Sequence, residues 1–428
     1  MLSISRAQAQ QLDQEDSLKN FRQEFHIPQK DGKDCIYFCG NSLGLQPKQT
    51  QHYIQRELDT WQAEAVEGHF RGERPWMYYH KLFKKSLAQL VGAKEEEVVA
   101  MNNLTSNLHF LLVSFYRPTS TRFKILMDGG AFPSDQYAIE SQVKFHAASG
   151  GFDWKGAIVE VFPREGETYL RTEDILATIE KHKEQLALVM MGGVQYYTGQ
   201  FFDLKAITEK AHAVGALAGF DLAHAIGNLP MQLHDWDVDF ATWCSYKYLN
   251  SGPGGISGIF VHEKYALDPK LPRFAGWWGY EEAKRFKMQK GFIPMYGADG
   301  WQHSNVNILS AAAHLASLEI FDRAGIQQLR KKSVQLTAFA EKLVMEVAGR
   351  YPQLQHISPR EPEARGAQLS LVVKAYGKLV FDYLSEQGVI ADWREPEVIR
   401  IAPIPLYNTF EEVFDFALLL EYGLKKFA

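Results

Sequence analysis

Short apolar runs in the middle of the chain alternate with stretches of helical periodicity. The runs span residues 124–127, 157–162, 187–194, 216–220, 238–244 and 256–261. Helical patterns at 172–183 and 204–214 separate several of them. Repeated strand–helix–strand units connect by right-handed crossovers, which give a mostly parallel sheet covered by helices. The sequence therefore predicts an α/β fold with a mostly parallel central sheet flanked by helices.

The pattern changes after residue 305. One face of a long helix is marked by Leu329, Leu336, Leu343 and Val347. Strands at 369–373 and 398–401 and helices at 378–387 and 410–426 follow. We expect three parts: an N-terminal arm (1–47) packed on the small domain, a large domain (48–305) and a smaller C-terminal α+β domain (306–428).

Composition excludes several classes of protein. The 428 residues are 46% hydrophobic and 23% charged, with a formal net charge of −5. This is typical of a soluble globular protein and argues against nucleic acid as a partner. The chain lacks a run long enough for a bilayer and an apolar secretory signal, and its three cysteines form no disulfide framework or metal cluster. We therefore expect a cytoplasmic protein with no membrane partner and no metal.

Two predicted strands end in residues of opposite charge. Asp221 follows the run 216–220 and precedes His224, whereas Lys247 follows the run 238–244 and precedes a glycine-rich loop at 251–255. Ligands of such sheets bind at the carboxyl ends of the strands. A lysine that forms a Schiff base and an aspartate that keeps a pyridine nitrogen protonated are what pyridoxal 5′-phosphate (PLP) needs. The pair therefore predicts a PLP site.

Each of these residues also has an ordinary structural interpretation. A lysine after a strand is usually solvated, and an aspartate there is often a helix N-cap. His224 is either a structural hydrogen-bonding residue or a neighbour of the cofactor ring. Tyr246 points away from Lys247 if the strand persists, and its hydroxyl reaches the phosphate only if the strand kinks. The combination favours the cofactor interpretation.

Two further turns suit the same cofactor. Phe132 in Phe132-Pro133-Ser134-Asp135 is a core residue or offers a stacking face to a flat ring. The stretch at Leu104 and Thr105 predicts a helix N-terminus capped by Thr105, whose backbone N–H groups suit a phosphate. Every helix has a cap, so this signal is weak by itself.

Arg400 lies in an alternating strand of the expected small domain. It either pairs with an acid such as Asp392 or Glu397 or binds the carboxylate of a substrate. His69, Ser304 and Asn305 lie in predicted exposed loops, and their spacing alone assigns them no role.

Long motifs in one order run nearly end to end along the chain, at 40–45, 74–76, 131–141, 197–200, 219–225, 245–250, 276–279, 285–288 and 401–408. On these motifs the chain resembles the kynureninase family, in the aminotransferase class V branch of the fold type I (aspartate aminotransferase-like) PLP enzymes. Tyr280 departs from the family pattern, in which we expect His. This difference puts only the local loop in doubt.

The resemblance implies roles for individual residues. Lys247 would bind PLP, Phe132 would stack on its ring, and Asp221 would contact the pyridine edge. The remaining implied cofactor contacts are Leu104, Thr105, Pro133, Ser134, Asp135, His224, Tyr246, Trp277 and Asn305, of which Trp277 and Asn305 would act across a dimer interface. Arg400 would bind the substrate carboxylate, and the other implied substrate contacts are Ser42, His69, Ser304 and Asn305.

The resemblance also implies an activity. A homodimer would hydrolyse the Cβ–Cγ bond of L-kynurenine or 3-hydroxy-L-kynurenine, giving an anthranilate and L-alanine, in tryptophan catabolism and NAD biosynthesis. His69 and Asn305 would favour the 3-hydroxy substrate, and Tyr246 is our candidate for the acid that protonates the β-carbon.

Alternatives are a class V aminotransferase, a cysteine desulfurase-like lyase and a non-catalytic PLP-fold subunit. Desulfurases of this branch place His before the lysine and a cysteine downstream, whereas Tyr246 precedes Lys247 and Cys244 is the last cysteine.

Overall fold

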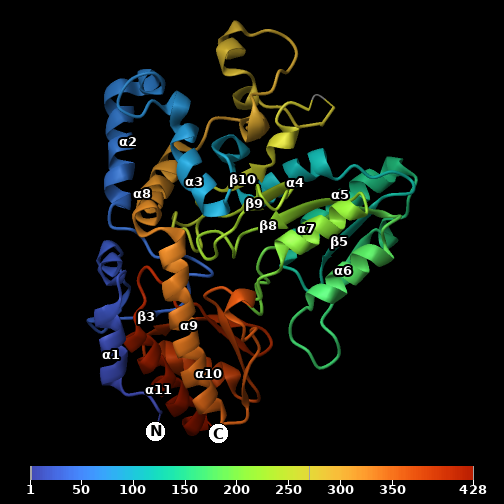
Figure 1. Cartoon of the computed structure of the whole chain (residues 1–428). Coiled ribbons are helices and arrows are strands. Elements are labelled where there is room, and N and C mark those ends of the chain that lie inside the picture. The colour runs from blue at the N-terminus through green and yellow to red at the C-terminus, as the bar shows by residue number, and fades with distance from the viewer. Residues whose placement is uncertain (1, 269, 428) are drawn as a thin grey trace.

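The computed structural model describes residues 2–268 and 270–427 (Figure 1). Its larger sheet has the strand order β4-β10-β9-β8-β7-β5-β6. The strands are β4 (Val98–Ala100), β5 (Lys124–Asp128), β6 (Ile158–Val161), β7 (Leu186–Gly192), β8 (Leu217–Asp221), β9 (Phe240–Trp243) and β10 (Gly258–Val261). Pairs from β6 to β9 are parallel, whereas β10 is antiparallel to both β9 and β4. The predicted mostly parallel sheet is confirmed.

Alternating side chains of these strands enter two hydrophobic cores, one on each face of the sheet. In β7, Val189 and Met191 pack on one face, and Leu188 and Met190 pack on the other. The second face is covered by α4 (Leu104–Phe115) and α5 (Pro133–Gly150). The first is covered mainly by α2 (Thr50–Glu64), α3 (Lys84–Val91), α6 (Thr172–Lys181), α7 (Leu204–Ala213) and α8 (Ile308–Ala324). A sheet buried on both faces explains why its strands read as continuous apolar runs.

A second, four-stranded antiparallel sheet lies in the C-terminal part of the chain, in the order β11-β12-β15-β14. Its strands are β11 (Leu354–His356), β12 (Leu369–Val373), β14 (Asp392–Arg394) and β15 (Val398–Ile401). It shares a core with α9 (Ile326–Ala348), α10 (Gly377–Glu386) and α11 (Phe410–Phe427). The chain passes from α8, on the large core, to α9 at Gly325, whose φ of +72° suits a glycine.

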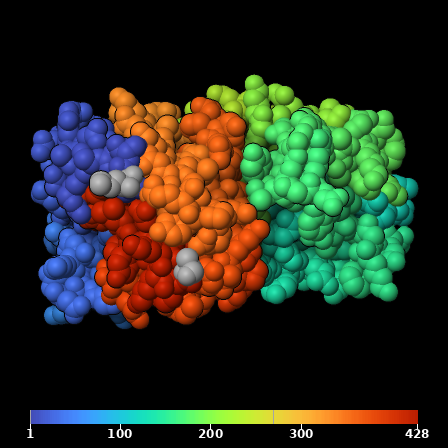
Figure 2. All heavy atoms as spheres, turned by 90° about the horizontal axis from the view of Figure 1, so that it is seen from below, coloured from blue at the N-terminus to red at the C-terminus, as the bar shows by residue number. Residues whose placement is uncertain are grey.

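The N-terminal segment contacts this second sheet and its helices. Ala9 of α1 (Arg6–Glu15) is buried in the same core, and β3 (Ile36–Tyr37) pairs in parallel with β13 (Val389–Ile390). A short hairpin of β1 (Gln29–Lys30) and β2 (Lys33–Asp34) lies between them in the sequence. Seen from below, the blue N-terminal residues lie against the red and orange C-terminal residues (Figure 2). The division into three parts stays a prediction.

The parallel strands bring several polar residues to one edge of the larger sheet. Asp128 ends β5, Gly192 ends β7 and Asp221 ends β8, and the residues that follow β9 include Lys247. This edge is where an α/β sheet binds its ligands. None of the described helices has the length and apolar character needed to cross a bilayer.

Candidate active site

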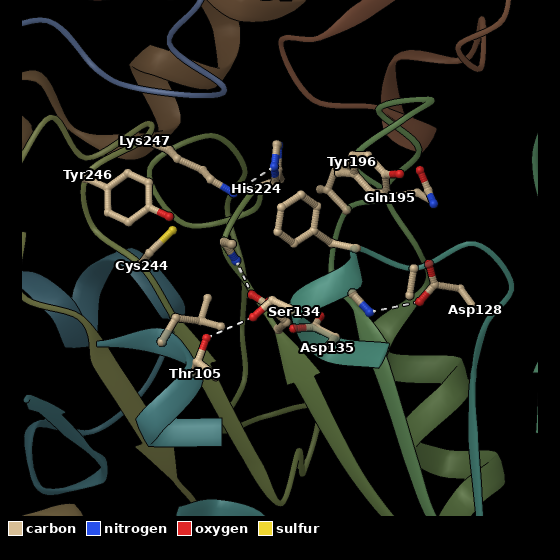
Figure 3. Close-up of a pocket in the computed structure, with 17 residues that line it drawn as sticks. Thr105, Asp128, Ser134, Asp135, Gln195, Tyr196, His224, Cys244, Tyr246 and Lys247 are labelled. Atoms are coloured by element: carbon tan, nitrogen blue, oxygen red, sulfur yellow. Dashed lines mark hydrogen bonds between the residues drawn. The ribbon is translucent and has the colours of Figure 1, made fainter. Parts of the chain in front are cut away.

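A cavity opens at this edge of the sheet. Nine of the predicted residues line it: Leu104, Thr105, Phe132, Ser134, Asp135, Asp221, His224, Tyr246 and Lys247. They come from the starts of α4 and α5, from the end of β8 and the segment after it, and from the segment after β9. Figure 3 labels six of them around this cavity, namely Thr105, Ser134, Asp135, His224, Tyr246 and Lys247.

Lys247 and His224 point toward one another across the cavity (Figure 3). Nζ of Lys247 lies 3.0 Å from Nε2 of His224 and 5.7 Å from the centre of the Phe132 ring. Burial, and then the positive charge of Lys247, hold the pKa of His224 well below its usual value. The neutral imidazole therefore accepts a hydrogen bond from Lys247 through Nε2, and its buried Nδ1 has no hydrogen-bond partner among the described residues.

Two buried carboxylates, Asp135 and Asp221, form the wall beside this pair. Asp221 Oδ1 accepts a 2.7 Å hydrogen bond from the backbone N–H of Ala223. Burial raises the pKa of both carboxyl groups, and that of Asp135 further because Asp221 is adjacent. Oδ1 of Asp135 has no partner among the described residues. A ligand that carries a cationic N–H group would supply a donor for this oxygen.

The opposite end of the cavity carries hydroxyl groups and the N-terminus of α4. Thr105 Oγ1 lies 2.8 Å from Ser134 Oγ, which stands in the first turn of α5. The prediction that Thr105 caps α4 is wrong: Asn103 is the cap, and its side chain accepts from the N–H of Ser106 at 3.0 Å. Thr105 therefore lies inside the first turn, where its hydroxyl is free to face the cavity. Hydroxyls and helix N–H groups fit a phosphate.

Tyr246 also faces the cavity, because β9 ends at Trp243 and the chain turns before the tyrosine. Its hydroxyl lies beside the thiol of Cys244 (Figure 3). Burial and the neighbouring thiol raise the pKa of Tyr246. The tyrosine is therefore neutral and able to donate a proton or a hydrogen bond.

Arg400 is 1% exposed and sits in β15, beside the cavity wall. Its Nη2 donates to Asp392 at 2.6 Å, and its Nη1 donates at 2.6 Å to the carbonyl oxygen of Tyr196, which lines the cavity. The structural pairing with Asp392 anticipated from the sequence is present. Nε of Arg400 is buried without a partner among the described residues.

The remaining predicted residues lie outside the cavity lining. Pro133 begins α5, and the backbone N–H of Ser42 donates to Cys39. His69 Nδ1 contacts the carbonyl oxygen of Val66 at 3.1 Å, and Ser304 donates to Asn305 at 3.0 Å in an exposed loop. Trp277 is 45% exposed and contacts Trp278 and Phe286. The described chain does not bring these residues together with Lys247, and their roles stay predictions.

The cavity also contains polar residues that the sequence analysis missed, namely Asp128, Gln195, Tyr196 and Cys244. Asp128 is the last residue of β5, and burial raises its pKa to about 6. Gln195 and Tyr196 follow β7 by a few residues. The rule that identified Asp221, a polar residue at the carboxyl end of a strand, would have found Asp128 as well.

Solved structures share this fold. A cysteine desulfurase from Thermococcus onnurineus matches with a TM-score of 0.74 at 18% identity over the whole of both chains. A mutant of the lyase C-DES with glycine covalently linked to its PLP cofactor matches at 0.72 and 17% identity, over 90% of this chain and 96% of that one. The fold is therefore that of the class V branch of fold type I PLP-dependent enzymes.

Relatives with similar sequences identify the family within this class of enzymes. Residues 329–420 match the family described as the kynureninase C-terminal domain. Kynureninase of Flavobacterium psychrophilum is 53% identical over 417 residues, which are 97% of each chain. Kynureninase of Nematostella vectensis is 48% identical over 99% of this chain and 94% of that one. The chain belongs to the kynureninase family.

Proposed function

We propose that this protein is a PLP-dependent kynureninase. It hydrolyses the Cβ–Cγ bond of L-kynurenine or 3-hydroxy-L-kynurenine to an anthranilate and L-alanine, in tryptophan catabolism and NAD biosynthesis. The observation that carries the proposal is the convergence of Lys247, Asp221 and His224 on one cavity, in a chain about half identical to kynureninases along nearly its full length.

The residues of the cavity fit PLP. Lys247 would hold its aldehyde carbon, and the buried carboxyl groups of Asp135, whose Oδ1 has no partner among the described residues, and Asp221 would hold the pyridine nitrogen. Thr105 and Ser134, with the N-terminus of α4, would hold the phosphate. Bound there, PLP supplies the electron sink that makes the Cβ–Cγ bond of a γ-keto amino acid breakable.

Residues of the chain itself carry out the proton transfers of the reaction. Released by the incoming substrate amine, the amine of Lys247 moves the proton at the substrate α-carbon. His224 holds this amine in place through its unprotonated Nε2. Tyr246 donates the proton that the β-carbon needs after water has added to the γ-ketone and the bond has broken. The raised pKa of Tyr246 keeps the hydroxyl proton available for that step.

Arg400 provides the charge that recognises the substrate. A guanidinium binds a carboxylate through two parallel N–H donors. Asp392 and the carbonyl of Tyr196 orient the group, and its unpartnered Nε offers one donor. The small domain therefore contributes the α-carboxylate contact, while the large domain contributes the cofactor site.

We also propose that the enzyme is a cytoplasmic homodimer with the three-part division described above. The side chains of Phe70, Trp277 and Phe286 are each about half exposed. The ring of Phe286 lies between the other two and contacts both of them. A second copy that covered these rings would also carry Trp277 and Asn305 toward a neighbouring site. His69 and Asn305 would then select the ring 3-hydroxyl group, which favours 3-hydroxy-L-kynurenine.

The decisive experiment measures anthranilate and alanine release from PLP-loaded protein, with the two substrates tested side by side. Lys247→Ala is the matched negative control. Release of both products by the native protein, but not by Lys247→Ala, supports the proposal. The ratio of the kcat/KM values for the two substrates then shows which substrate is preferred. Consumption of pyruvate as an amino acceptor without anthranilate release would instead indicate an aminotransferase. Sulfide release from cysteine would indicate a desulfurase, and no turnover of any of these substrates would indicate a binding subunit.

A further inference from the structure

The side chain of Gln368 connects three segments that are far apart in the sequence. Gln368 immediately precedes β12 and is 1% exposed. Its Nε2 donates at 2.9 Å to the carbonyl oxygen of Tyr196, in the segment after β7. Its Oε1 accepts at 2.9 Å from Nδ2 of Asn41, a completely buried residue of the N-terminal segment. The amide group of Gln368 is therefore bonded at both of its ends.

The partners of Gln368 permit one orientation of its amide group. A backbone carbonyl oxygen only accepts, so the NH₂ group must be the end that faces Tyr196. Nε2 also lies 3.3 Å from the carbonyl oxygen of Tyr197 and 3.0 Å from Oγ of Ser370. The amide oxygen then faces the other way, where Nδ2 of Asn41 supplies its donor. Asn41 therefore fixes the direction in which the Gln368 amide points.

The carbonyl oxygen that Gln368 holds also orients Arg400. Nη1 of Arg400 donates to the carbonyl of Tyr196 at 2.6 Å, and Nη2 donates to Asp392 at 2.6 Å. Because both terminal nitrogens are held, the plane of the guanidinium is fixed. Nε of the same group is buried without a partner among the described residues. A shift of the Tyr196 carbonyl would therefore turn the whole guanidinium, including the Nε donor.

The residues just before β12 are also connected to the lysine of the site. The backbone N–H of Ala367 donates to Oδ1 of Asn228 at 2.9 Å, and Nδ2 of Asn228 donates to the carbonyl of His224 at 2.8 Å. The ring of His224 in turn lies 3.0 Å from Nζ of Lys247. An added Cβ at Gly366 would lie 2.1 Å from Nδ2 of Asn228, so the two segments are closely packed. One short segment thus contacts the supports of both charged residues.

We infer that Gln368 is a positioning residue that holds Arg400 at a fixed place relative to Lys247. The inference rests on the proposed function, in which the substrate amine takes the place of Lys247 on PLP and Arg400 binds the substrate carboxylate. An α-amino acid carries its amine and carboxylate on one carbon atom. The two residues must therefore keep a fixed separation, although Lys247 follows a strand of the larger sheet and Arg400 lies in the second sheet. Gln368 maintains this separation through the Tyr196 carbonyl, and Asn41 keeps the amide correctly oriented.

Two probes separate the carboxylate contact from the amine contact. L-alanine carries both groups, whereas L-alaninamide has the amine without the carboxylate. The experiment measures the Kd of each probe for PLP-loaded protein from the change in cofactor absorbance. The native protein should bind L-alanine more tightly than L-alaninamide. Gln368→Met, which keeps the length of the side chain but removes the amide, should raise the Kd of L-alanine by roughly 3–30-fold and leave that of L-alaninamide unchanged.

A double-mutant cycle shows whether Gln368 acts through Arg400. In Arg400→Lys, which lacks the planar donors, the addition of Gln368→Met should raise the Kd of L-alanine no further. Asn41→Asp is nearly isosteric but has no donor for the amide oxygen of Gln368, so it should weaken L-alanine binding in the same selective way. Gln142→Met is the matched control, because Gln142 is a buried glutamine whose side chain contacts His109 between α5 and α4. It should keep both native Kd values.

The outcomes distinguish this proposal from the proposed function. Equal loss of both probes in Gln368→Met, additive effects in the double variant, or a native Kd for L-alanine in Gln368→Met would each overturn the positioning role, and so would equal affinity of the native protein for both probes. Anthranilate release by the native protein would leave the hydrolase standing in all of these cases. Selective loss of L-alanine binding without any anthranilate release would support the positioning role and refute the hydrolase. If thermal unfolding shows that Gln368→Met does not fold, Asn41→Asp replaces it in the same cycle.

Discussion

Nζ of Lys247 lies 3.0 Å from Nε2 of His224, although 22 residues separate them in the sequence. The contact forms because β8 and β9 are parallel neighbours and both segments emerge at the same edge of the sheet. Burial keeps His224 neutral, so its Nε2 acts as the acceptor. The lysine therefore has a fixed partner before any ligand arrives.

Replacement of His224 tests this positioning. We expect His224→Ala to lower kcat by roughly 10–100-fold, since misplacing a reacting group by about 1 Å costs a similar factor. The measurement is steady-state turnover together with the absorbance spectrum of the bound cofactor. His224→Gln, which retains a hydrogen-bonding group, should recover part of the loss. An equal loss of kcat in both variants would mean that turnover depends on the shape of the imidazole ring and not on its hydrogen bond to Lys247.

Asp128 should make the cofactor-free protein less stable as the pH rises. Burial raises its pKa from 3.8 to about 6, so between pH 4 and 6 the folded protein holds a proton that the unfolded chain has released. This contribution to the free energy of unfolding is fully present below pH 4 and is lost as the pH rises through 6. The total loss is up to about 3 kcal/mol.

Thermal unfolding between pH 4 and 7 checks this effect. Asp128→Asn should flatten the decline in Tm and exceed the native protein in stability at pH 7, while its amide oxygen still accepts from the N–H of Gly192. Asp31→Asn, at an exposed position, is the matched control and should follow the native profile. A steeper decline in Asp128→Asn would contradict the assigned direction.

Arg400→Lys should raise KM for the substrate far more than it changes kcat. Lysine keeps the charge but loses the planar pair of donors, and a charged hydrogen bond contributes about 1.5–3 kcal/mol, or roughly 10–150-fold. The KM and kcat values from initial rates separate the two effects. Arg394→Lys, on the same sheet and also paired with Asp392, is the control. An unchanged KM in Arg400→Lys would leave Arg400 with a structural role alone.

Gly44 couples the N-terminal segment to the lysine loop. Its backbone N–H donates to the carbonyl of Tyr246 at 2.8 Å, and an added Cβ would lie 2.3 Å from the carbonyl oxygen of Lys247 and 2.2 Å from Oδ1 of Asn250. Gly44→Ala should therefore destabilise the protein by about 1–3 kcal/mol and lower kcat.

Denaturant unfolding and turnover measure both consequences for Gly44→Ala. Gly156→Ala is the matched control, because nothing lies within 4 Å of the added Cβ there. If Gly44→Ala kept both the stability and the kcat of the native protein, the loop would be able to shift without displacing Lys247.

Much of the large sheet was predictable because its strands are buried on both faces. Apolar runs such as 187–194 and 216–220 correspond to β7 and β8, and the change of pattern after 305 anticipated the second sheet. Short or exposed strands such as β1 and β13 carry too few apolar residues to be seen in this way.

The sequence by itself determined that Asp221 and Lys247 stand at strand ends, and hence that they share an edge of a parallel sheet. It did not determine that Asn103 rather than Thr105 caps α4, because both residues are able to accept the same kind of bond. Only the tertiary structure decided that Gln195, Tyr196 and Cys244 join the cavity. The same holds for Asn41, Gln368 and Tyr196, which meet although they come from distant segments of the chain. Local pattern reports burial and element type, whereas proximity between distant residues depends on strand order, which no local pattern encodes.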